Sequence, residues 1–180
     1  MKIAQALKEK NIAEYLLYMW QVEDLIRAND CDPDKLKANV IVQFPAEDRP
    51  ALEEWYGNLV EMMRAEGVKE RGHLQINCNV LQELTELHAR LLASTRYPFY
   101  NAAYFKALPF IVELRQKNGH KDEPELETCF EALYGVLLLR LQKKEITPAT
   151  ETALKAISSF LSMLANYYAR DRKGELDLDD

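Results

Sequence analysis

The chain has 180 residues, of which 48% are hydrophobic and 29% charged, and its formal net charge is −6. This length suits one ordinary domain that buries about 70% of the surface its unfolded chain exposes. The negative charge argues against nucleic acid as a partner, because duplex binding requires a basic surface that displaces counterions. Four acidic residues lie within 175–180, so the acidic bias belongs mainly to the C-terminal end.

The N-terminal segment and the longest apolar run favour a cytoplasmic protein with no membrane partner. The first ten residues carry charges throughout and lack the apolar stretch of a signal peptide. The longest apolar run, residues 132–139, is far shorter than the roughly 20 residues that a membrane helix requires. The three cysteines form no CxxC pair, so we expect three reduced thiols.

Helix start and stop signals divide the chain, and no segment shows the alternating pattern of a strand. Asn11 and Glu14 have the spacing of a capping box. Asp32 and Thr147 each precede a proline, which favours a helix start, and Gly119 favours a helix end. The expected helices cover residues 11–29, 32–43, 48–67, 73–94 and 98–118, with two more that begin near 122–124 and at 147.

These signals predict an all-α fold. We expect a single-domain antiparallel bundle of six to seven helices over residues 1–173, because long helices joined by short loops pack as antiparallel neighbours. The acidic tail, residues 174–180, has nothing to bury and is expected to be disordered.

A carboxylate interrupts the apolar stripe of the first expected helix. The stripe consists of Ile12, Leu16, Met19, position 23 and Ile26, and position 23 is Glu23. A buried carboxylate must be paired or protonated, because removing an isolated charge from water is costly. Arg27, one turn further on, is the nearest available cation. The alternative is that Glu23 lies at the edge of the stripe, where its carboxylate reaches water.

Two polar residues interrupt the stripe of the fourth expected helix. That stripe consists of Leu74, Asn77, Leu81, Leu84, His88 and Leu91. Asn77 and His88 are about 16 Å apart along the helix axis, so they cannot share one metal ion or one reacting atom. We expect Asn77 to form an interhelical hydrogen bond. His88 is either a hydrogen-bonded core or helix-edge histidine, or part of a ligand site.

The fifth expected helix is rich in aromatic residues. Tyr97, Tyr100, Tyr104, Leu108 and Ile111 share one face, and Pro109 removes a hydrogen bond from the middle of the helix. Such a face suits either core packing or the wall of a pocket. Because a short loop joins the fourth and fifth helices, we expect Tyr100 and Tyr104 to pack near His88.

The sequence contains none of the motifs that would assign a cofactor, a metal or a reaction. It lacks a Walker loop and the GxGxxG, GxSxG and HExxH patterns. A di-iron bundle requires two Glu-x-x-His motifs within its helices, and the residue three positions before His88 is Thr85. Cys78 and Cys129 lie within expected helices without a neighbouring histidine, so we expect inert thiols. We therefore predict no cofactor, no metal and no catalytic residue.

Residues 11–27, which read NIAEYLLYMWQVEDLIR, resemble the opening of an uncharacterised bacterial family of helical proteins, a domain of unknown function. The resemblance implies an all-helical cytoplasmic protein. It transfers no activity and no site residue.

Two functions remain open. The first is a non-enzymatic structural or interaction protein that self-associates, most simply as a dimer, through an apolar helix face. Residues 15–20 and 132–139 support it, because they are hydrophobic on nearly all sides. The alternative is a small-ligand-binding bundle, or an enzyme with an atypical site, between the first, fourth and fifth expected helices. The residues that would bound this ligand pocket are Glu23, Arg27, His88, Tyr100 and Tyr104.

Overall fold

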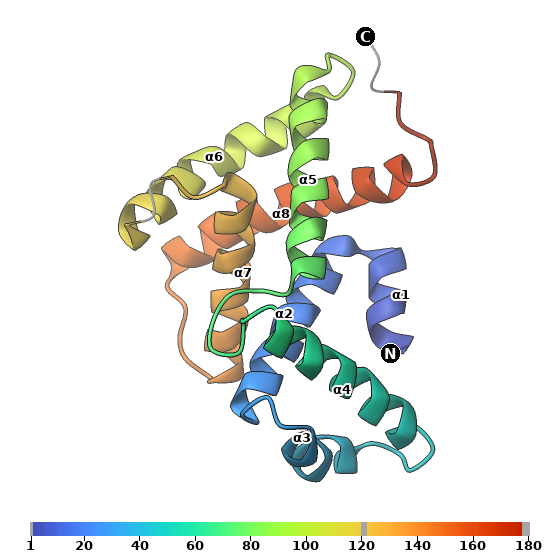
Figure 1. The fold of residues 1–180 in the computed structure, drawn as a ribbon. Helices are drawn as coiled ribbons and strands as arrows, with labels where there is room; N and C mark the ends of the chain where they lie inside the picture. The colour runs from blue at the N-terminus through green and yellow to red at the C-terminus, as the bar shows by residue number, and fades with distance from the viewer. Residues whose placement is uncertain (1, 120–121, 178–180) are drawn as a thin grey trace. The chain divides into compact units, whose positions relative to one another are not determined.

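The computed structural model describes residues 2–119 and 122–177, and all regular structure within them is helical (Figure 1). The elements are α1 (Lys2–Lys10), α2 (Ile12–Ala28), α3 (Pro33–Asn39), the 3₁₀ turn η1 (Ile41–Gln43), α4 (Arg49–Ala65), α5 (Gln75–Ala93), α6 (Pro98–Asn118), α7 (Glu125–Leu141) and α8 (Pro148–Asp171). The all-α prediction is confirmed. Within this described part, no helix combines the length and apolar composition needed to cross a membrane.

The described residues form eight α-helices, so the predicted number of six to seven is wrong. The missed helix is α1, of which only Ala4 is buried. Its residues favour a helix, but they form no wide apolar stripe. The expected helices were recognised by such stripes, so α1 was not among them. The helix expected over residues 32–43 is also shorter, because α3 ends at Asn39 and η1 follows. Three β-branched residues in a row, 40–42, disfavour continuation of the α-helix there.

The chain divides into two compact units, and the first comprises residues 1–10 and Glu14–Val80. It contains α1, most of α2, α3, η1, α4 and the first turns of α5. Asp32 caps α3 as expected, because its side chain accepts a hydrogen bond from the Asp34 amide at 2.9 Å. Both α3 and η1 pack against α4. The stripe predicted for α2 is buried along its length.

The second unit comprises residues 11–13 and Leu81–Asp180, and thus the rest of α5 together with α6, α7 and α8. Among its described helices, α6 packs most extensively against α8, and α7 contacts both. Figure 1 shows α6 and α8 running in opposite chain directions. The expected boundaries hold well here, because Gly119 adopts the left-handed conformation after α6 and the Thr147 hydroxyl accepts the Thr150 amide at the start of α8.

The single-domain prediction for residues 1–173 concerns both units together and stays a prediction. After α8, residues 172–177 form turns and irregular structure, and the backbone carbonyl of Asp177 accepts a hydrogen bond from the Tyr97 hydroxyl at 2.9 Å. Residues 178–180 lie outside the described part of the chain. The predicted disorder of the tail, residues 174–180, therefore also stays a prediction.

Candidate functional site

Glu23 is completely buried in the first unit, and both of its carboxylate oxygens have polar partners. Its exposed fraction is 0%. Oε1 accepts hydrogen bonds from the Leu74 amide at 3.0 Å and from Nδ2 of Asn77 at 2.6 Å. Oε2 lies 2.6 Å from Nδ1 of His73. The alternative in which Glu23 reaches water at the edge of the stripe is therefore wrong, and the interhelical hydrogen bond expected of Asn77 is confirmed.

The partners of Glu23 indicate why α2 carries a carboxylate at this position. Leu74 immediately precedes α5, so the Glu23 carboxylate lies at the N-terminus of that helix, where unpaired amides and the helix dipole favour a negative charge. The His73 ring stacks on Trp20 with 4.1 Å between ring centroids. These contacts anchor the segment before α5 to α2.

Arg27 is a more distant partner of Glu23 than the sequence predicts. Its guanidinium is 3.9 Å from Oε2 of Glu23 but donates to Oδ1 of Asp24 at 2.8 Å. It also donates to the backbone carbonyls of Val68 and Gly72. Arg27 therefore holds the connection between α4 and α5, and His73 is the closer basic partner of Glu23. His73 escaped the sequence analysis because it precedes the stripe of α5.

His88 lies in a second buried polar cluster, in the second unit. Its Nδ1 is 2.6 Å from the hydroxyl of Tyr100, and the rings of Tyr104 and Phe160 pack edge-on against it with centroids 5.0 and 5.4 Å away. Glu125 completes the cluster, because its Oε2 accepts the Tyr104 hydroxyl at 2.8 Å and lies 4.0 Å from Nε2 of His88. The expected packing of Tyr100 and Tyr104 near His88 is confirmed.

Burial controls protonation in this cluster. It lowers the pKa of His88 below the ordinary 6.5, although the nearby Glu125 carboxylate acts in the opposite direction. Burial also raises the pKa of Tyr100, and it raises the pKa of the Cys129 thiol to about 12. Burial and the hydrogen bond to Glu125 together raise the pKa of Tyr104 to about 12. The phenols and the thiol are therefore protonated at neutral pH, which favours packing over acid–base or nucleophilic chemistry.

We expect protonation of His88 to destabilise the folded chain as the pH falls below about 6.5, the ordinary pKa that His88 regains on unfolding. Between that value and the lower folded pKa the unfolded chain binds more protons, so the free energy of unfolding falls by up to about 1.4 kcal/mol per pH unit. Besides Glu125, the groups facing the ring are the hydroxyls of Tyr100 and Tyr104.

Urea unfolding of wild type and His88→Gln at about pH 7.5 and about pH 5.5 measures this effect. Glutamine still offers an acceptor to Tyr100 but does not titrate. The amount by which the free energy of unfolding of wild type exceeds that of the variant should be smaller at the lower pH. A difference that is equal at both pH values, or larger at the lower one, contradicts the proposed effect of His88 protonation.

The five residues predicted to bound a ligand pocket fall into both units. Glu23 and Arg27 lie in the first unit, and His88, Tyr100 and Tyr104 lie together in the second. The hydrogen bonds and ring contacts described above for Glu23 and for His88 stay within their own unit. The predicted pocket that joins the two groups stays a prediction, and none of the five lines the groove described next.

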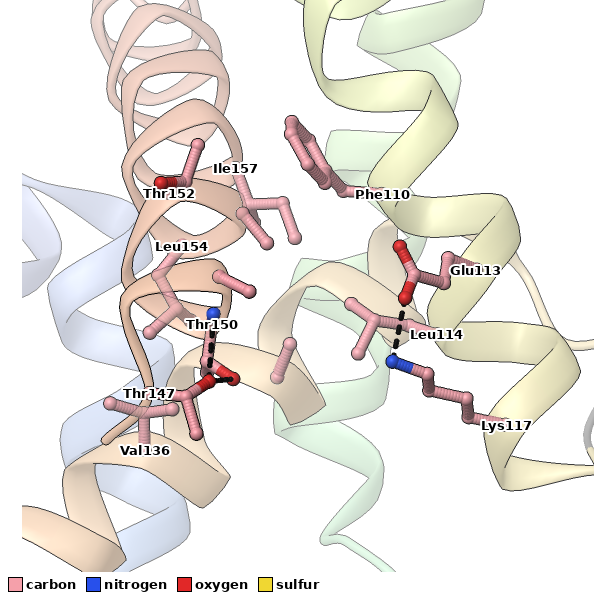
Figure 2. Close-up of a pocket in the computed structure, with 13 residues that line it drawn as sticks. Phe110, Glu113, Leu114, Lys117, Val136, Thr147, Thr150, Thr152, Leu154 and Ile157 are labelled. Carbon is pink, nitrogen blue, oxygen red and sulfur yellow. Dashed lines mark hydrogen bonds and ion pairs between the residues drawn. The ribbon is translucent and has the colours of Figure 1, made fainter. Parts of the chain in front are cut away.

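A groove of about 440 Å³ lies in the second unit among α6, α7 and α8 (Figure 2). Its apolar lining includes Phe110 and Leu114 of α6, Val136 of α7, and Leu154 and Ile157 of α8. Figure 2 shows the α6 side chains on one side and the α8 side chains on the other. Pockets of this volume and composition accept small organic molecules.

Polar groups lie along both sides of this groove. On α6, Lys117 pairs with Glu113 at 2.6 Å, and at the start of α8 the hydroxyls of Thr147 and Thr150 are 2.9 Å apart (Figure 2). No sequence pattern predicts the groove. Its lining comes from three helices, and the only local signal is a row of small residues at the start of α8, such as Ala149 and Ala153.

The outward face of α6 is also apolar. Phe99 is 80% exposed, Phe105 62% and Val112 43%. Ala102, Phe105, Pro109 and Val112 recur with gaps of three, four and three, so they form one stripe, with Phe99 at its N-terminal end. We call these five residues the outer stripe.

The opposite face of α6 forms part of the core. Tyr100 and Ile111 of the predicted aromatic face are buried there, together with Ala107. The helix continues through Pro109, and it is apolar on two faces. By contrast, residues 15–20, which the sequence analysis offered as an interaction face, are mostly buried within the chain. Residues 132–139 are half-buried apart from the buried Val136.

The described residues contain no cluster of three or more His, Cys, Asp or Glu side chains that could hold a metal ion. No curated protein and no solved structure matches the chain. A family model described as "Domain of unknown function (DUF4924)" matches residues 1–175, and this confirms the resemblance seen in residues 11–27. Because that match covers nearly the whole sequence, the chain belongs to the DUF4924 family.

Proposed function

We propose that this protein is a non-enzymatic, cytoplasmic structural or interaction protein that self-associates as a dimer through α6. The observation that carries the proposal is the outer stripe, in which Phe99 and Phe105 expose most of their surface. A helix that is apolar on two faces is expected to be covered on both of them. Contiguous apolar surface of this kind is typical of interaction sites.

The two polar clusters support a non-enzymatic role. Both oxygens of the Glu23 carboxylate and Nδ1 of the His88 ring have hydrogen-bonding partners within the protein. A catalytic group needs a pKa near the working pH and access to a substrate. Burial raises the pKa values of the phenols and the thiol around His88 far above neutral pH, so the His88 cluster is best explained as part of the folded core.

Sedimentation velocity of wild type, Phe105→Glu and Val42→Glu at tens of micromolar tests self-association. Wild type should sediment with twice the monomer mass of 20.8 kDa, and Phe105→Glu should sediment as the monomer because it places a charge in the interface. Val42 is 51% exposed, so it is a matched apolar control outside α6, and its variant should remain dimeric. A wild-type species of 20.8 kDa alone contradicts the proposal.

The groove favours a second candidate function, the binding of a small, largely apolar molecule. Its support is the volume of about 440 Å³ and the apolar lining from three helices. Titration with the fluorescent probe ANS measures binding, and Ala153→Phe should abolish it by filling the groove. Phe105→Glu should leave binding unchanged. Binding that is not saturable, or that survives in Ala153→Phe, excludes the groove as the site.

A further inference from the structure

Two opposite charges flank the outer stripe on the same side of α6. Lys106 and Glu113 are both exposed and stand seven residues apart, which is two helical turns. They therefore project from nearly the same edge of the stripe, one before Pro109 and one after it. In paired helices, charges at such flanking positions determine the partner and its orientation.

We propose that two copies of this chain pair through α6 in an antiparallel arrangement, with Lys106 of each copy facing Glu113 of the other. This inference rests on the self-association proposed above and specifies its geometry. A two-fold axis perpendicular to α6 would pass beside the helix at the level between Pro109 and Phe110. Lys106 and Glu113 would then lie at equal distances from this axis. The same operation brings Phe105 close to Val112 of the second copy, so the apolar residues meet along the stripe.

The charges favour this orientation over a parallel one. In a parallel, in-register pair the two-fold axis runs along the helices, so the charged edge of one copy lies on the opposite side of the interface from that of the other, and neither Lys106 nor Glu113 meets a charged partner. The antiparallel pair therefore gains two attractive contacts that the parallel pair lacks, and it also opposes the dipoles of the two helices. The charge pattern thus selects a second copy of this chain as the occupant of the stripe.

The existing ion pair of Glu113 does not prevent this contact. Glu113 pairs with Lys117 at 2.6 Å, but the two side chains are exposed by 56% and 68%. Exposed pairs at this spacing are weak, so Glu113 can exchange or share its partner at little cost. The stripe from Ala102 to Val112 is only about 15 Å long, so the interface is small and a dissociation constant in the micromolar range is expected.

Charge reversal tests the orientation. Lys106→Glu and Glu113→Lys should each weaken dimerisation about tenfold, because each substitution turns two attractive contacts into repulsive ones. The double variant Lys106→Glu/Glu113→Lys should restore the wild-type dissociation constant, measured by sedimentation equilibrium. Absence of this rescue in a protein that does dimerise overturns the antiparallel arrangement.

Disulfide formation gives an independent test of the same geometry. In a Cys78→Ser background, which removes the exposed native thiol, Pro109→Cys should form a dimer on mild oxidation because it lies beside the axis. Ala102→Cys should not, because its copies lie at opposite ends of the interface. Equal cross-linking at both positions indicates a parallel pair and overturns this inference while leaving self-association intact. A wild-type protein that stays monomeric overturns both proposals.

Discussion

Replacing Glu23 by leucine is expected to lower the free energy of unfolding by about 3–5 kcal/mol, because it removes one member of a buried polar cluster and leaves the others without partners. The Leu74 amide and the Asn77 side chain would lose their acceptor, and His73 would lose a carboxylate 2.6 Å away. Each abandoned buried group costs about 1–3 kcal/mol. The whole stability of a domain is only about 5–15 kcal/mol, so this single change consumes much of it.

Urea unfolding followed by circular dichroism measures the effect, and Glu61→Leu is the matched control. Glu61 pairs with Arg64 at 2.8 Å, but its side chain is largely exposed, so its loss should cost less than about 1 kcal/mol. Equal stability of the two variants would show that the hydrogen bonds of Glu23 contribute little.

The second large effect is expected at Phe160. Its substitution by alanine should lower the free energy of unfolding by about 3–5 kcal/mol. Phe160 is fully buried, and its ring contacts those of His88, Tyr100 and Tyr104. Alanine would leave a cavity bordered by the imidazole and both phenols. The cost therefore combines lost apolar burial with the loss of contacts around the cavity.

Thermal and urea unfolding of Phe160→Ala and Phe160→Leu check this prediction. Leucine fills more of the space, so its cost should be clearly smaller than that of alanine. If both variants lower the free energy of unfolding equally, and by less than about 1 kcal/mol, the cluster around His88 is loosely packed. The interpretation of His88 as a residue of the packed core would then be wrong.

The stripes of the long helices were predictable because they depend on local spacing alone. The apolar residues of the α2 stripe are buried in the structure as the pattern predicts, whereas the pattern left open whether Glu23 is buried among them or reaches water. The hydrogen bond of Asn77 followed from the same reasoning, because a polar group on a core stripe needs a partner. The pairing of Glu23 with His73 could not be predicted in this way, because it depends on how the connection between α4 and α5 folds against α2.

Features that depend on tertiary geometry escaped the sequence. The groove among α6, α7 and α8 is lined by residues from three separate helices, and the periodicity of a single helix does not predict how three helices are arranged. The outer stripe was hidden for another reason. Phe99 and Phe105 lie beside the core aromatics Tyr100 and Tyr104, so the sequence presents one aromatic segment whose two faces separate only in the folded helix.

Solvent labelling of Phe105 as a function of protein concentration tests directly whether the protein self-associates through α6. Hydroxyl-radical footprinting read out by mass spectrometry reports the exposure of single side chains. Labelling of Phe105 should decrease as the concentration rises through the micromolar range, while labelling of Val42 should stay constant. Labelling of Phe105 that is constant across the same range would show that α6 does not form the interface.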